Sequence, residues 1–120
     1  SSAASDVYKR QMNLCAMWVS DVYEKAGFGR IGGNANDMYR NFANNSDPSQ
    51  LKEGMVVAVE SSSSGGIAGA IYGHVGIYIG EGKVMHNVGT IKTISLDDWI
   101  SLFGKNSPVG WGYPPNVNVP

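Results

Sequence analysis

The sequence is poor in cysteine, and this narrows the chemistry open to it. Cys15 is the single cysteine among 120 residues, which excludes an internal disulfide and leaves the side chain for packing, metal binding or nucleophilic chemistry. The two histidines, His74 and His86, lie at no spacing typical of a zinc site. We therefore expect no metal and no cofactor, and Cys15 to be either a buried packing residue or a nucleophile.

Charge and long apolar runs are also scarce. Charged residues make up 16% of the chain, the formal net charge is -1, and no run of Lys or Arg could follow a phosphate backbone. No stretch approaches the roughly 20 apolar residues that span a bilayer. We expect no nucleic-acid partner, no membrane insertion and a monomer. The chain length and the hydrophobic fraction of 42% suit one globular domain.

The first residues look foreign to the rest of the sequence. The run DVYKRQ at Asp6 to Gln11 matches one reading frame of a common sequencing adapter. We interpret residues 1–11 as a non-native or adapter-derived segment and residues 12–120 as one domain.

Helical periodicity begins after this segment. Apolar residues recur at every fourth position, at Leu14, Trp18, Val22 and Ala26. Asn13 suits the N-cap and Gly27 the C-terminal stop, which places Cys15 in the first turn of the helix. A second, shorter helix is expected over residues 36–44.

The second half of the chain predicts a sheet. Short strands are expected over residues 55–59, 74–79, 83–88, 90–94 and 109–113, with a helix over 96–103. The segment 61–73, rich in Ser and Gly, is expected to be a mobile surface loop and a candidate substrate lid.

A lone Cys on an apolar helix stripe is more often a packing residue than a nucleophile, but the position of Cys15 is also compatible with chemistry. A helix N-terminus lowers a thiol pKa, and its free backbone N–H groups can stabilise an oxyanion. The N–H groups of Cys15 and Ala16 are the expected oxyanion donors. What the thiol still requires is a base.

The hairpin over residues 74–88 can supply the base. If Ile79 pairs with Lys83, then Gly76 faces His86, and His74 and His86 share one face of the sheet as diagonal neighbours. In this register His74 is the general base and His86 orients its ring and fixes its tautomer.

A second register is open. If Gly80 pairs with Lys83, every side chain of the second strand changes face, and Asn87 replaces His86 as the orienting residue. Gly82 suits the left-handed position of a three-residue loop, which favours the first register and therefore His86.

Four segments carry a resemblance to a known family: N-L-C-A-M-W-V at Asn13 to Val19, L-K-E-G-M-V-V at Leu51 to Val57, G-H-V-G-I-Y-I-G at Gly73 to Gly80, and K-V-M-H-N at Lys83 to Asn87. The chain resembles the NlpC-type cell-wall cysteine peptidases and is similar to the related CHAP domains. The resemblance implies a papain-like catalytic domain of the α+β class, with N-terminal helices packed on a small antiparallel sheet. Carried over by position, Cys15 becomes the nucleophile, His74 the base and His86 the third member.

The resemblance also implies an activity and a place for it. The expected reaction is hydrolysis of peptidoglycan stem-peptide amides, such as the D-glutamyl-diamino acid bond, through an acyl-enzyme, outside the cell or in its wall. Around Cys15 the sequence reads L-C-A-M where NlpC-type enzymes usually have D-C-S-G, which is closer to CHAP sequences. A CHAP-like muramoyl-alanine amidase or cross-bridge endopeptidase is therefore an alternative. A non-catalytic wall-binding module and an acyltransferase are two others.

Overall fold

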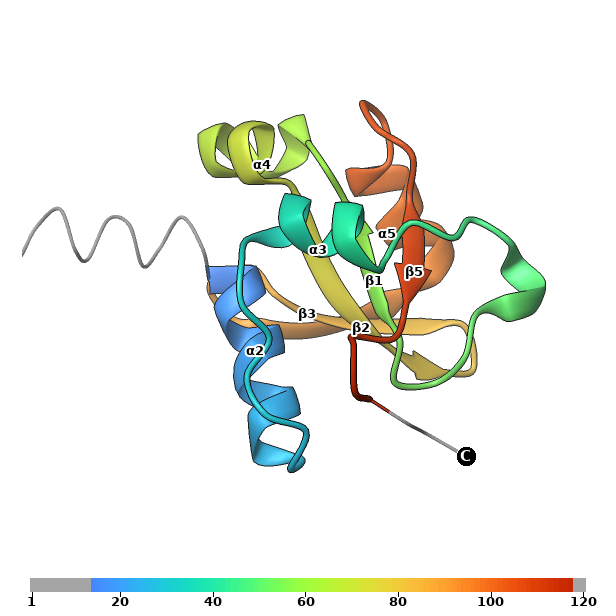
Figure 1. The fold of residues 1–120 in the computed structure, drawn as a ribbon. Helices are drawn as coiled ribbons and strands as arrows, with labels where there is room; N and C mark the ends of the chain where they lie inside the picture. The colour runs from blue at the N-terminus through green and yellow to red at the C-terminus, as the bar shows by residue number, and fades with distance from the viewer. Residues whose placement is uncertain (1–13, 118–120) are drawn as a thin grey trace, which may run out of the picture.

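Five antiparallel strands form one sheet with the order β4-β3-β2-β1-β5 in the computed structural model of the protein, which describes residues 14–117 (Figure 1). The strands are β1 (Val56–Val59), β2 (His74–Gly80), β3 (Lys83–Asn87), β4 (Ile91–Ser95) and β5 (Gly110–Gly112). The α-helices are α2 (Leu14–Lys25), α3 (Ala35–Asn41), α4 (Gly66–Tyr72) and α5 (Leu96–Phe103), with 3-10 turns η1 (Pro48–Gln50) and η2 (Ser63–Gly65). This arrangement confirms the predicted α+β class.

The centre of the sheet is buried on both faces, whereas the edge strand β4 is largely exposed. Helices α2 and α3 pack on one face, where they enclose Val56 and Ala58 of β1. Helix α5 packs on the other face, against Val57 and Val59 of the same strand. A strand covered on both sides reads as a continuous apolar run, which is why β1 has the sequence Val-Val-Ala-Val.

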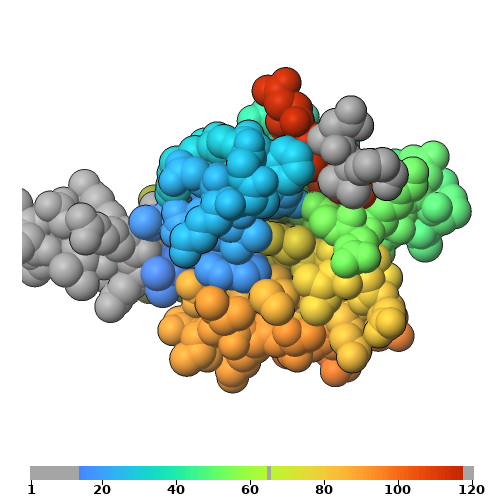
Figure 2. Space-filling view, turned by 90° about the horizontal axis from the view of Figure 1, so that it is seen from below, coloured from blue at the N-terminus to red at the C-terminus, as the bar shows by residue number. Residues whose placement is uncertain are grey.

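Helix α2 lies beside strands that are remote from it in sequence, as the blue and orange surfaces of Figure 2 show. Its buried stripe includes Ala16, Val19 and Tyr23, and the hydroxyl of Tyr23 donates a hydrogen bond to the carbonyl of Gly54. The helix ends at Lys25, two residues before the predicted stop at Gly27, which has a φ of 91° and whose N–H donates to the carbonyl of Glu24 at 3.0 Å. The predicted N-cap, Asn13, and the segment 1–11 lie outside the described residues.

The β2–β3 hairpin combines both predicted registers. In its body Tyr78 pairs with Val84, as in the first register, so His74 and His86 project from one face. At its end Gly80 pairs with Lys83, as in the second. The predicted pairing of Ile79 with Lys83 is therefore wrong.

A bulge at Ile79 reconciles the two registers, because it inserts one residue into β2 and leaves the faces of the inner residues unchanged. The loop then has two residues rather than three. Both have positive φ, 54° for Glu81 and 70° for Gly82, as a type I′ turn requires.

The prediction that segment 61–73 is an irregular loop is wrong. The segment contains η2 and helix α4, and the N–H of Ser62 donates to the carbonyl of Gly69 at 2.8 Å. The hydroxyl of Ser63 donates to Asn106 at 2.8 Å, which ties the segment to the chain after α5. Its composition suggested a loop, yet these distant bonds hold a helix; its role as a lid stays a prediction.

The other boundaries differ from the predicted ones by a few residues. Helix α3 stops at Asn41, since the N–H groups of Phe42 and Ala43 both donate to Met38. Strand β3 ends before Val88, whose N–H donates to the carbonyl of Thr90 in the turn. Helix α5 has the predicted bounds. Within residues 14–117 no helix is both long and apolar enough to cross a bilayer.

The close contact of Gly76 with β3 is testable. A Cβ on Gly76 would lie 2.7 Å from a methyl of Val84 and 2.9 Å from the carbonyl oxygen of Met85. We expect Gly76→Ala to lower the free energy of unfolding by about 1–3 kcal/mol, measured by urea unfolding followed through tryptophan fluorescence. Gly32→Ala is the matched control, because a Cβ there meets nothing within 4 Å, and its effect should stay within about 0.5 kcal/mol. Equal losses in the two variants would contradict this account.

Candidate active site

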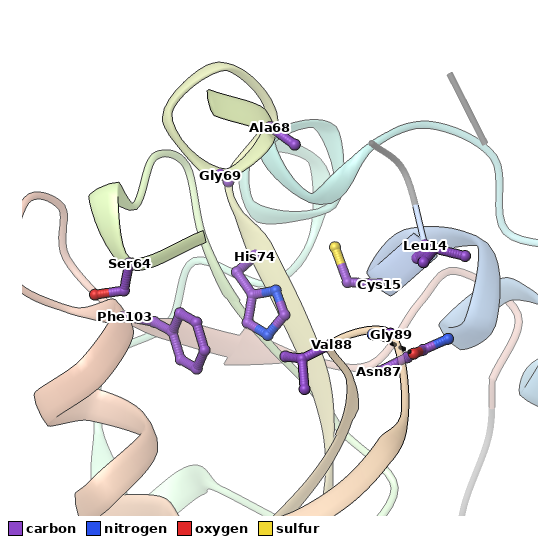
Figure 3. A pocket seen from close by; sticks show the side chains of 11 residues that line it. Leu14, Cys15, Ser64, Ala68, Gly69, His74, Asn87, Val88, Gly89 and Phe103 are labelled. Carbon is purple, nitrogen blue, oxygen red and sulfur yellow. Dashed lines mark hydrogen bonds between the residues drawn. The ribbon is translucent and has the colours of Figure 1, made fainter. Parts of the chain in front are cut away.

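Cys15 lines a pocket at one end of the sheet. It is the second residue of α2, with 9% of its surface exposed, and the pocket has a volume of about 560 Å³. His74, the first residue of β2, lines the same pocket (Figure 3). The other lining residues are Leu14, Ser64, Ala68, Gly69, Gly73, Asn87, Val88, Gly89 and Phe103. The structure thus brings together the predicted nucleophile and the predicted base.

His86 lies behind His74, as the first register predicts. The Nε2 atom of His74 and the Nδ1 atom of His86 form a hydrogen bond of 2.9 Å. Both residues are buried, with exposed fractions of 5% and 3%. Because Nε2 of His74 is engaged with His86, Nδ1 is the ring nitrogen left for Cys15, and Figure 3 shows a ring nitrogen on that side.

Two aromatic side chains of α5 hold the His74 ring. Phe103 stacks on it with centroids 4.1 Å apart and planes at 29°, and Trp99 stacks at 5.6 Å and 21°. Nothing in the sequence assigns either residue to the site. Their spacing of four residues in a helix shows that they share a face. What the sequence lacks is any sign that this face covers the histidine.

Burial controls the protonation of the two histidines. Loss of solvent, with the neighbouring His86 ring, lowers the pKa of His74 to about 3. Burial also lowers the pKa of His86, with a smaller contribution from the positive charge of Lys92. Both rings are therefore uncharged at neutral pH.

Burial acts on Cys15 in the opposite direction to the one expected from its place in the helix. The apolar surroundings raise the pKa of the thiol, and the N–H groups of Val75, Ala16 and Cys15 offset only part of this. The expectation of a lowered thiol pKa is therefore wrong for the free protein. The two N–H groups predicted as oxyanion donors do approach the sulfur, and Val75 adds one that the sequence did not indicate.

Asn87, the alternative third member, has a different environment. Its Oδ1 accepts a hydrogen bond of 3.0 Å from the N–H of Gly89, in the turn after β3. It lines the pocket, while His86 is the residue in contact with His74. Among residues 14–117, no group of three His, Cys, Asp or Glu side chains is placed to hold a metal ion.

The burial of His74 predicts an acid-sensitive fold. The unfolded chain binds a proton at the ordinary pKa of 6.5, and the folded chain only near 3. This difference does not change the free energy of unfolding above pH 6.5. As the pH falls from 6.5 toward 3, protonation of the unfolded chain lowers that free energy by about 1.4 kcal/mol per pH unit. Between pH 7.5 and pH 5 the parent should lose about 2 kcal/mol more than His74→Gln.

Urea unfolding of both chains at the two pH values checks this. Groups that titrate in the same way in both chains contribute equally to the two losses, so their contributions cancel. An equal loss in parent and variant would show that His74 titrates normally in the folded protein.

The comparison with known families agrees with this geometry. The NlpC/P60 family matches residues 9–106, a range that includes Cys15, His74 and His86. No curated protein matches the chain. Members of this family are generally cysteine peptidases or hydrolases that act on peptidoglycan peptides, with a papain-like α+β domain. The match covers most of the sequence, and the chain belongs to the NlpC/P60 family.

Proposed function

We propose that the protein is a cysteine peptidase or amidase that hydrolyses peptide amides of bacterial peptidoglycan. The observation that carries the proposal is a buried Cys15 that shares a pocket with His74, which in turn bonds to His86 at 2.9 Å, in a chain of the NlpC/P60 family. A nucleophile, a base and a residue that orients the base are the parts that amide cleavage by a thiol requires.

The resting pair is uncharged, which determines the first step. The thiol keeps its proton and His74 is neutral, because burial disfavours both ions. As the sulfur attacks the carbonyl carbon of the substrate, the thiol proton moves to Nδ1 of His74. Negative charge then develops on the carbonyl oxygen, and the N–H groups of Cys15 and Ala16 are the proposed donors to it.

His86 determines which nitrogen of His74 can act. When Nδ1 of His86 accepts a hydrogen bond from the Nε2–H group of His74, the neutral His74 ring carries its proton on Nε2 and none on Nδ1. That atom can then take the thiol proton. His86 is in this sense a positioning residue, since it acts on the reaction through His74.

The remaining steps return the enzyme to its starting state. His74 gives its proton to the leaving nitrogen as the C–N bond breaks, and the acyl group stays on Cys15 as a thioester. Water then attacks the thioester while His74 takes its proton. The C–S bond breaks, the carboxylic acid leaves, and the proton returns to the thiol.

The finer features of the reaction are part of the same proposal. The bond is an amide of the stem peptide, such as the D-glutamyl-diamino acid bond, with the muramoyl-alanine and cross-bridge amides as alternatives. Peptidoglycan lies outside the cell membrane, and we therefore propose that the protein acts outside the cell or in its wall.

Removal of the sulfur tests the nucleophile. We expect Cys15→Ala to abolish the release of new amino groups from purified peptidoglycan, because no acyl-enzyme can form. Muropeptide masses identify the bond, and equal urea midpoints of variant and parent show that the fold persists. A variant that digests walls as fast as the parent contradicts the mechanism. A parent that binds walls without cleaving them indicates a binding module.

The dependence of the thiol on its base can be measured without substrate. Iodoacetamide should label Cys15 at pH 7 about tenfold or more faster in the parent than in His74→Gln, because the imidazole removes the thiol proton during attack. The urea-unfolded chain, whose thiol has an ordinary pKa, is the reference for each protein. The same rate in both folded chains would indicate a packing cysteine.

A further inference from the structure

The side chains that line the pocket carry no formal charge. This is unexpected for a site that would bind cell-wall peptides, because such peptides carry charged groups. Among residues 14–117, no Lys, Arg, Asp or Glu lines the pocket. Three uncharged stretches supply nearly all of its wall: residues 14–20 of α2, residues 61–80 with α4 and β2, and residues 84–91 around the β3–β4 turn. This holds for the described part of the chain.

The charged residues that lie near these stretches do not bring a charge into the pocket. Glu60, which precedes the segment with α4, is 3.4 Å from the guanidinium of Arg40 in a surface ion pair. Lys92 pairs with His86 across β3 and β4, and it does not line the pocket. The one pocket residue besides Cys15 that can ionise is His74, and its ring is neutral.

The polar groups of the pocket are neutral as well. The Oδ1 atom of Asn87 already accepts from Gly89, which leaves the amide nitrogen as its donor toward a ligand. The Ser64 hydroxyl donates to the carbonyl of Leu102. Around them lie small or apolar residues, among them Ala68, which Figure 3 shows on α4 above the pocket.

A charged group of a substrate would bind unfavourably in this pocket. A carboxylate or ammonium group that enters the pocket loses its water and gains no counter-charge, and such uncompensated burial is unfavourable. A carboxamide or a small neutral residue loses less, because neutral donors and backbone groups can replace its hydrogen bonds. A charged group should therefore bind in this pocket less favourably than a neutral one.

We propose that the site takes peptide amides whose neighbouring groups are uncharged, such as a stem peptide in which the carboxylate beside the cleaved bond is amidated. This specificity rests on the proposed peptidase activity. The penalty on the charged substrate applies when it enters the pocket, so it should appear mainly in KM, with a further effect on kcat where the charge lies beside the reacting carbonyl.

Two synthetic stem peptides test the proposal. They share one sequence and differ only at the α-carboxyl group of the D-glutamyl residue, which is free in one and amidated in the other. We expect kcat/KM for the amidated peptide to exceed that for the acidic peptide by at least about tenfold, measured by chromatography of the products. Cleavage of the acidic peptide at an equal or higher rate overturns the specificity and leaves the peptidase activity standing. A protein that cleaves neither peptide nor purified walls overturns both.

A charge placed in the wall gives the converse test. In Ala68→Lys the new ammonium group can pair with the substrate carboxylate, so the ratio of acidic to amidated kcat/KM should rise about tenfold or more. Ala68→Gln is the matched control of similar length without the charge, and its ratio should stay close to that of the parent. A lysine variant with the ratio of the glutamine variant overturns the proposal. If the lysine variant does not fold, the two peptides still decide the question with the parent.

Discussion

The burial of the His74 ring is the constraint on which the site depends. Phe103 and Trp99 cover the ring and His86 bonds to its Nε2 atom, so two elements besides β2, namely α5 and β3, define one orientation. An imidazole in such surroundings stays neutral. It can therefore serve as a base at neutral pH, and its orientation does not rely on an ion pair.

The two reactive groups belong to opposite faces of the sheet. Cys15 packs with the core under α2 and α3, whereas His74 packs against the aromatic residues of α5. They meet where β2 begins, next to the close approach of Gly73 to β1, where a Cβ would lie 2.0 Å from the carbonyl oxygen of Val59. The geometry of the pair therefore depends on the packing of both cores, and damage to either core should reach the site.

Local sequence signals predicted the parts of the fold that local bonds determine. The recurrence at every fourth residue and Gly27 predicted α2, and the spacing of His74 and His86 about a glycine-rich turn predicted their common face. Distant contacts determine the rest. Helix α4 was not predicted, because Ser and Gly usually indicate loops. The hydrogen bonds that hold its segment, such as the one from Ser63 to Asn106, join residues far apart in the chain.

The thiol of Cys15 shows how a tertiary effect overrides a local one. Its place in the first turn of α2 correctly puts N–H groups beside the sulfur, and these favour the thiolate. Burial under neighbouring elements opposes them and is the larger effect, so the thiol pKa rises. In the proposed mechanism the sulfur becomes nucleophilic as its proton moves to His74. Exclusion of water and charge thus has two consequences in the proposed mechanism: the thiol and the imidazole are neutral at rest, and a charged group of the substrate would lose its water without gaining a counter-charge.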